Sequence, residues 1–336
     1  MTTEGSFGAV DGQPARSFSL ESDDGISIVL TDFGARLVCL NVPDRDGRAD
    51  DIVLGFDEAQ SYANSPSYFG ATVGRYANRI ARGQFSLLGD TIQLDCNEGR
   101  NHLHGGHDGW DRRLWTAEYD ESTVTFTTTS PHGDMGFPGA CEATSIYQLD
   151  GRTLRITMIA TPSATTIINM VNHSYFNLAG HASGHVLSQQ MALPSDFYVP
   201  VDNELLATGE IRAVAGTAFD FRELRAIGLF GGEDCDHNWC LRGGGSGLAE
   251  AAQVHDPASG RWLRLWTSEP GVQMYTGGKL HDRIVGKAGA RYRRNAGFTL
   301  ETQKFPGSPN FAHFPSAVVD AGEVYRHEML FEFSCD

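Results

Sequence analysis

The sequence predicts an all-β protein built as a large antiparallel β-sandwich. Apolar and polar residues alternate with a period of two in many short segments, and the helical period is nearly absent. The chain also contains 39 glycines and 13 prolines, which are spread along it as turn residues between these segments. A parallel α/β sheet would need helices between its strands, so the pattern favours antiparallel strands with few short helices.

The predicted strands follow one another along the whole chain. Those with the clearest alternation are residues 26–30, 85–87, 92–94, 154–158, 262–266 and 329–333. Gly89 and Asp90 separate two of them and predict a hairpin. The best candidate for a helix is a turn or two at residues 57–62. Similar strands lie on both sides of the glycine-rich run 243–247, so we interpret this run as a flexible surface loop and expect one domain over residues 1–336.

The charge of the chain restricts its partners. Lys and Arg total 26 against 42 Asp and Glu, which gives a net charge of −16. Repulsion then disfavours nucleic acid and anionic membrane surfaces, and a neutral or cationic ligand is expected. The chain lacks an apolar run of about 18 residues and, at residues 1–5, the features of a signal peptide, so we expect a cytoplasmic protein. The six cysteines form no CxxC pair, which indicates free thiols.

A polar cluster at residues 172–177 (NHSYFN) follows the β-branched run 165–171. A strand that ends in an imidazole, a phenol and two carboxamides suits the binding of a small polar ligand. We hypothesise that His173 donates a proton and that Glu301 accepts one. Alternation in the predicted strand 298–303 points Glu301 away from the core. The alternatives are a strand-end histidine bonded to the backbone and a solvated carboxylate.

Three arginines, Arg75, Arg79 and Arg82, stand among small residues just before the predicted hairpin. In such a place arginine can fork hydrogen bonds to sugar hydroxyls or to a carboxylate. The alternative is a set of surface charges beside a turn, which we favour for Arg82 and extend to Arg75.

His102 and His104 form a His-x-His pair, a spacing that places both rings on one face of a strand and that metal sites in β-barrels use. A third ligand would have to come from elsewhere, and the spacing singles none out. A metal site, a structural role and a direct hydrogen-bonding or acid/base role all remain open, and we favour the last.

Two carboxylates, Asp234 and Asp236, precede Trp239, as in carbohydrate sites where rings stack on sugars and carboxylates accept from hydroxyls. An acidic turn is the alternative. Gln273 adds a carboxamide on a predicted strand.

Seven short motifs occur in order along the chain: GRYANRI, NHLHGG, GFPGA, NHSYFNL, DCDHNWC, PGVQMYTG and LETQKFPGSPN. Taken together, they resemble those of the aldose 1-epimerase (galactose mutarotase) family, and the resemblance spans essentially the whole chain. It implies the galactose mutarotase-like supersandwich with a concave sugar-binding face, in agreement with the period-two pattern.

The resemblance also implies roles for individual residues. His173 matches the family's general acid, Glu301 its general base and His104 its second active-site histidine. The residues that match positions lining the sugar are Asn78, Arg79, Ser174, Tyr175, Asp236 and Gln273. His102 stands where many relatives carry a small polar residue and receives no role. The resemblance implies no metal and no cofactor.

The implied reaction is that of an isomerase, which interconverts the α and β anomers of free aldoses such as galactose and glucose. Glu301 takes the proton of the C1 hydroxyl while His173 gives one to the ring oxygen, and the opened ring closes again on the opposite carbonyl face. Reference pKa values of about 4.3 for Glu and about 6.5 for His predict a carboxylate and an imidazolium near neutral pH.

Two other functions remain open. A sugar-phosphate mutarotase would need a basic pocket for the phosphate, whereas HSYFNL and LETQ look closer to the free-sugar branch. A non-catalytic carbohydrate-binding sandwich could lack the acid or the base, but His173 and Glu301 are both present. The expected partner is a small aldose, and a monomer or homodimer is expected.

Overall fold

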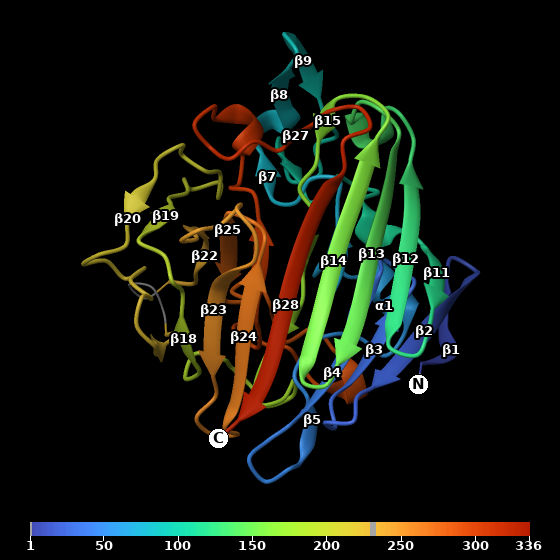
Figure 1. The fold of residues 1–336 in the computed structure, drawn as a ribbon, viewed down its shortest axis with the longest axis vertical. Helices are drawn as coiled ribbons and strands as arrows, with labels where there is room; N and C mark the ends of the chain where they lie inside the picture. Colours follow the sequence, from blue (N-terminus) through green and yellow to red (C-terminus); the bar gives the residue numbers. More distant parts are fainter. Residues whose placement is uncertain (1, 229–232) are drawn as a thin grey trace.

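Two large antiparallel sheets form the sandwich of the computed structural model, which describes residues 2–228 and 233–336 (Figure 1). Among these residues, the larger sheet has nine strands in the order β11 (Thr116–Tyr119), β12 (Thr123–Ser130), β13 (Cys141–Asp150), β14 (Thr153–Pro162), β28 (Tyr325–Cys335), β24 (Arg261–Thr267), β23 (Ala249–His255), β18 (Gln190–Ala192) and β21 (Arg225–Ala226). The second sheet has six described strands in the order β17 (Tyr175–Phe176), β26 (Phe298–Gln303), β25 (Gly271–Tyr275), β22 (Asp236–Cys240), β19 (Phe197–Val199) and β20 (Arg212–Ala213).

The N-terminal segment adds a third sheet in sequence order, made of β1 (Thr3–Val10), β2 (Gln13–Glu21), β3 (Ser27–Thr31), β4 (Arg36–Pro43) and β5 (Ala49–Asp51). Short ladders complete the described strands: β6 (Thr72–Val73) with β16 (Val171–Asn172), β7 (Arg79–Ile80) with β10 (His102–Leu103), β8 (Gln84–Leu87) with β9 (Asp90–Gln93), and β15 (Thr166–Ile167) with β27 (Val318–Val319). The helix α1 (Ala59–Ala63) overlaps the helix expected at residues 57–62. The predicted all-β class is therefore confirmed.

The period-two pattern of the sequence corresponds to burial in the sheets. Along β28, Met329, Phe331 and Phe333 are buried, and Glu332 between the last two is exposed. This terminal strand lies between β14 and β24, in the middle of the larger sheet (Figure 1). The hairpin predicted at Gly89 and Asp90 is confirmed as β8 paired with β9.

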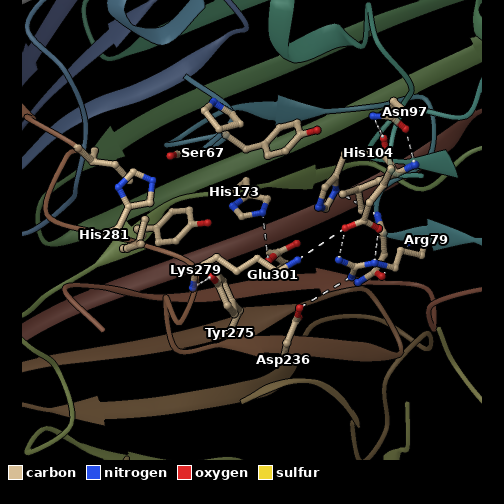
Figure 2. Close-up of a pocket in the computed structure, with 18 residues that line it drawn as sticks. Ser67, Arg79, Asn97, His104, His173, Asp236, Tyr275, Lys279, His281 and Glu301 are labelled. Atoms are coloured by element: carbon tan, nitrogen blue, oxygen red, sulfur yellow. Dashed lines mark hydrogen bonds and ion pairs between the residues drawn. The ribbon is translucent and has the colours of Figure 1, made fainter. Parts of the chain in front are cut away.

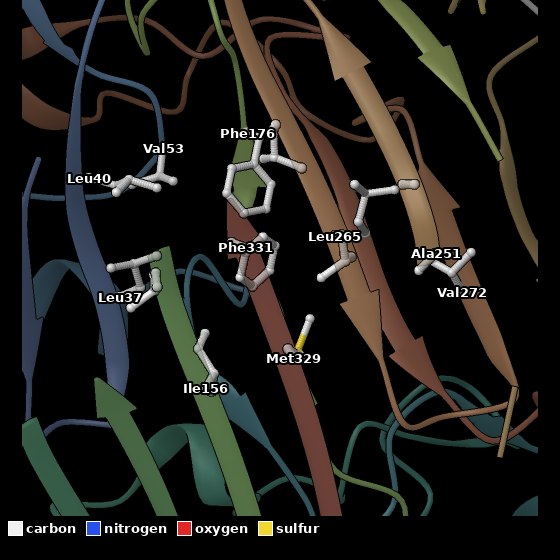
Figure 3. Close-up of a cluster of buried hydrophobic side chains, with 14 of the residues drawn as sticks. Leu37, Leu40, Val53, Ile156, Phe176, Ala251, Leu265, Val272, Met329 and Phe331 are labelled. Carbon is white, nitrogen blue, oxygen red and sulfur yellow. The ribbon is translucent and has the colours of Figure 1, made fainter. Parts of the chain in front are cut away.

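The main hydrophobic core fills the space between the sheets (Figure 3). The ring of Phe176 lies 5.5 Å from that of Phe331 on β28 and 6.0 Å from that of Phe298 on β26, so it joins the two large sheets. Leu37 and Leu40 of β4 belong to the same cluster. Because residues of all three sheets share this core, we propose that residues 1–336 form one domain.

The six-stranded sheet positions the candidate site. On β26, Phe298 and Leu300 belong to the core, whereas Glu301 faces a cavity on the other side of the strand. All six residues of β26 are buried, because loops cover its cavity side as well. The described cysteines are free thiols, as expected. None of the described helices is long and apolar enough to cross a membrane.

Candidate active site

A cavity of about 380 Å³ lies over the six-stranded sheet (Figure 2). The residues predicted from the sequence that line it are Asn78, Arg79, His104, His173, Tyr175, Asp236 and Glu301. They come from segments spread over more than two hundred positions of the chain, and the fold brings them to one place. Cavities of a few hundred Å³ with converging polar groups are typical of small-molecule sites.

His173 and Glu301 face each other inside this cavity. His173 Nε2 lies 3.5 Å from Glu301 Oε1, and the two side chains are only 5% and 3% exposed. The hydroxyl of Thr299 donates a hydrogen bond of 2.8 Å to Glu301 Oε1. Glu301 Oε2 has no hydrogen-bond partner among the described residues. One carboxyl oxygen is therefore held in place, and the other is buried without a hydrogen-bond partner among the described residues.

Burial changes the proton affinity of both groups. Desolvation lowers the pKa of His173 to about 4 and raises the pKa of Glu301 to about 8. At 3.5 Å the two charges would attract each other, but the loss of water from both is the larger effect. The expected carboxylate–imidazolium pair is thus wrong for this structure, which favours a neutral carboxyl and a neutral imidazole between these pKa values.

Two tyrosines hold the ring of His173 from both sides. The ring of Tyr68 is stacked at 5.6 Å and that of Tyr175 at 5.2 Å, each inclined by 23°. Tyr68 also lies 4.8 Å from the ring of His104, and Tyr175 packs edge-on against Phe69 at 4.9 Å. The stacking leaves the imidazole little freedom to rotate, so its Nε2 stays directed at Glu301.

His104 presents a proton donor to the cavity. Its Nδ1 accepts a hydrogen bond of 3.2 Å from the backbone N–H of Asn78, which places the ring proton on Nε2. The ligand atoms of His104, His173 and Glu301 lie within 4.8 Å of one another, as in a metal site. A metal would need a lone pair on His104 Nε2, however, and the bond from Asn78 leaves an N–H there. The donor set therefore does not fit a metal ion.

His102 lies outside the cavity. Its Nδ1 donates to the carbonyl of Asp95 at 2.8 Å, and its fully buried ring packs edge-on against Phe137. The expectation that both rings of the His-x-His pair share one face was wrong, because β10 ends at Leu103 and His104 adopts a left-handed φ of 51°. His102 is a core residue.

Arg79 and Asp236 form a polar wall of the cavity. Arg79 donates two hydrogen bonds, of 2.6 and 2.8 Å, to the carboxylate of Glu98, and its Nη1 lies 3.8 Å from Asp236 Oδ2. Gln273 donates to Asp236 Oδ1 at 2.6 Å. These bonds fix the guanidinium and the carboxylate side by side before any ligand binds.

Two predicted residues do not line the cavity. His173 and Tyr175 line the cavity, whereas Ser174 between them does not. The hydroxyl of Ser174 donates to Asn172 Oδ1 at 2.6 Å. Gln273 is buried beside Glu301 in the neighbouring strand, and it reaches the cavity only through Asp236.

The other two arginines of the predicted cluster lie away from the cavity. Arg75 is buried and donates to the carbonyls of residues 130, 131, 138 and 139. The surface position considered for it is therefore wrong, and it ties loops together instead. Arg82 is exposed, as favoured from the sequence. The run 243–247 follows the end of β22 remote from Asp236 and contributes no residue to the cavity lining.

Comparison with known proteins agrees with the geometry. A sequence model of the family described as "Aldose 1-epimerase" matches residues 16–332. The chain belongs to the aldose 1-epimerase family.

Relatives in this family cover nearly the whole chain. Galactose mutarotase of Bos taurus is 44% identical over 94% of this chain and 93% of its own. Aldose 1-epimerase of Escherichia coli (strain K12) is 34% identical over 97% of each. A solved aldose epimerase homologue from C. elegans superposes with a TM-score of 0.89 at 28% identity, over 99% of both chains. The predicted family and the predicted supersandwich fold are thus confirmed.

In this aldose 1-epimerase family member, sequence reasoning missed several residues that line the cavity. They include Tyr68, Glu98, Tyr275 and Lys279. Glu98 could have been sought as the carboxylate that a buried Arg79 requires. Tyr68 stands in the ordinary-looking run 65–69 (SPSYF), and no spacing marks it.

Proposed function

We propose that this protein is an aldose 1-epimerase, which interconverts the α and β anomers of free aldoses such as galactose and glucose. The observation that carries the proposal is the buried pair of His173 and Glu301, 3.5 Å apart in a cavity lined by polar groups. The free oxygen Oε2 of Glu301 supports a role as proton acceptor.

In the proposed mechanism the C1 hydroxyl of the sugar donates to Glu301 Oε2, and the ring oxygen accepts from His173 Nε2. Transfer of both protons breaks the bond between C1 and the ring oxygen and leaves the open-chain aldehyde, with Glu301 and His173 both neutral. After rotation about the C1–C2 bond, His173 takes back the proton of the ring hydroxyl and Glu301 returns one to the carbonyl oxygen. The two groups end in their initial forms, so no other reactant is consumed.

The pKa values fit this sequence of protonation states. Burial favours a neutral Glu301 and a neutral His173, and this is the state of the pair after ring opening. Water exclusion therefore helps to drive the transfers out of the charged pair. The carboxylate–imidazolium pair holds the same number of protons as the neutral pair. Transfer of one proton from Glu301 to His173 when the sugar binds therefore forms the reactive state without exchange with solvent.

We propose supporting roles for the other lining residues. His104 donates its Nε2–H to a sugar oxygen near C1. Arg79, Asn78 and Asp236 bind ring hydroxyls, and Tyr175 orients His173 and contacts the sugar. Ser174 and Gln273 are given a revised role, because they do not line the cavity. Their hydrogen bonds support a role in holding Asn172 and Asp236, respectively, in place. All of these steps use side-chain protons, and none requires a metal or a cofactor.

A sugar phosphate fits the cavity less well than a free sugar. The cations Arg79 and Lys279 line it, and both are directed at Glu98, with Lys279 Nζ 3.6 Å from Glu98 Oε1. Among the described lining residues, the carboxylates of Glu98 and Asp236 balance these two cations, so no excess positive charge is offered to a phosphate. A free aldose is therefore the preferred substrate class.

Polarimetry tests the proposal. Freshly dissolved α-D-galactose, α-D-glucose and glucose 6-phosphate are each followed with and without the protein. We expect faster mutarotation of the two free sugars than of the phosphate. No acceleration of any sugar, together with calorimetric evidence of sugar binding, would favour the non-catalytic carbohydrate-binding sandwich instead.

A further inference from the structure

A buried polar cluster lies behind the cavity, between the two large sheets. Its centre is His327, which is fully buried on the inner face of β28 and is not part of the cavity lining. Inside a sandwich a polar side chain destabilises the fold unless its hydrogen bonds are satisfied. Its partners therefore indicate what it contributes.

His327 connects two segments that lead to the proposed acid and base. Its Nδ1 lies 3.0 Å from the carbonyl oxygen of Met170 and must carry a proton to donate there. Its Nε2 accepts from the hydroxyl of Thr302 at 2.7 Å, and Thr267 Oγ1 lies 3.2 Å away. Met170 precedes His173 by three residues, and Thr302 directly follows Glu301.

A second side chain of β28 holds the same residue, Met170. The backbone N–H of Met170 donates to the hydroxyl of Tyr325 at 3.2 Å, and that hydroxyl donates to Glu269 Oε1 at 3.1 Å. Both backbone polar groups of Met170 are thus bound by the inner face of β28. Glu269 is in turn paired with Lys304 at 2.9 Å, at the end of β26.

Backbone pairing alone does not set the distance between His173 and Glu301. The ladder between β17 and β26 begins at the pair of Tyr175 and Thr299, two positions from His173 and Glu301. The backbone of His173 bonds instead to residues 70 and 71, and Glu301 pairs with β25. The two groups therefore stand on backbones that are not directly bonded at that point.

We propose that His327 is a positioning residue, which sets the spacing between His173 and Glu301 by binding Met170 and Thr302 at once. This inference rests on the proposed aldose 1-epimerase function. A second connection, from the N–H of Lys304 to Asn169 Oδ1 at 2.9 Å, keeps the segments together when His327 is replaced. Loss of His327 should therefore misplace the pair and leave the fold standing.

The test compares variants in the polarimetric galactose assay and in thermal unfolding. His327→Phe keeps a ring of similar size and removes the bonds to Met170 and Thr302. We expect kcat to fall roughly 10- to 100-fold, because a small misplacement of the acid and the base slows proton transfer. KM should change less than about threefold, because the groups that bind the sugar stay in place. His327→Asn retains a donor near Nδ1 for Met170 and should recover part of the lost kcat. Thr302→Val alone should lower kcat. Added to His327→Phe, it should cause no further loss, because both substitutions remove the same hydrogen bond.

Met329→Ala is the matched control. Met329 is the next inner residue of β28, is equally buried, and belongs to the hydrophobic core. Its truncation should lower the melting temperature while kcat stays near that of the wild type. If His327→Phe is destabilised in the same way and its kcat is also unchanged, the residue is only structural and the inference is overturned.

Two further outcomes separate the possible failures. If His327→Phe does not fold, Thr302→Val decides alone, and an unchanged kcat in that variant overturns the inference. If the wild-type protein does not accelerate mutarotation at all, the proposed function has failed, whatever the variants do.

Discussion

Replacing Glu301 by Gln should reduce activity and raise stability at the same time. The amide keeps the shape of the carboxyl and can still accept from Thr299. It cannot take the proton of the C1 hydroxyl, so we expect kcat to fall roughly 10²- to 10⁴-fold, the usual contribution of a general base. Sugar binding should change little, because the cavity stays the same.

The stability gain follows from the pKa of Glu301. Burial raises this pKa from 4.5 to about 8, so the folded protein binds a proton in this range that the unfolded chain does not. The free energy of unfolding that the protonated carboxyl contributes is complete below about pH 4.5 and is lost as the pH rises to about 8. At about 1.4 kcal/mol per unit of pKa, this loss amounts to at most about 5 kcal/mol. Gln does not titrate and avoids this loss.

The assays are polarimetry and thermal unfolding across this pH range. The melting temperature of Glu301→Gln should exceed that of the wild type by several degrees at about pH 9 and by much less at about pH 5. Glu332→Gln, an exposed change on β28, is the control and should alter neither property. More than roughly a tenth of wild-type turnover in Glu301→Gln would exclude Glu301 as the general base, and a stability gain that does not depend on pH would exclude the raised pKa.

The pH profile of kcat/KM should be bell-shaped with limbs near 4 and 8, because His173 and Glu301 share one proton only between these values, and a flat profile through pH 8 would contradict this. Arg79→Lys should raise KM roughly tenfold, because it loses the bidentate bond to Glu98, and Glu98→Gln should change KM in the same direction; an unchanged KM in both variants would exclude this role. Ser174→Ala should change KM less than about twofold and cost about 1 kcal/mol of stability in chemical denaturation, because its hydroxyl bonds to Asn172, whereas a large rise in KM would place that hydroxyl on the sugar.

The fold class and the family could be predicted from the sequence. Alternation along residues 329–333 predicts which side chains enter the core, because a strand exposes its two faces in turn. The order of the short motifs identified the family and selected His173, Glu301 and His104 as the residues to consider. Local patterns of this kind depend only on neighbouring positions, so they can be read from the chain.

The arrangement and the protonation of those residues depend on the folded chain. The N–H of Asn78 fixes the proton of His104, and Glu98 clamps Arg79, although no spacing in the sequence connects the members of either pair. The neutral state favoured for Glu301 arises because several distant segments together exclude water from it. Proton positions and pKa values depend on contacts across the fold and on solvent access, and these exist only once the sheets have packed.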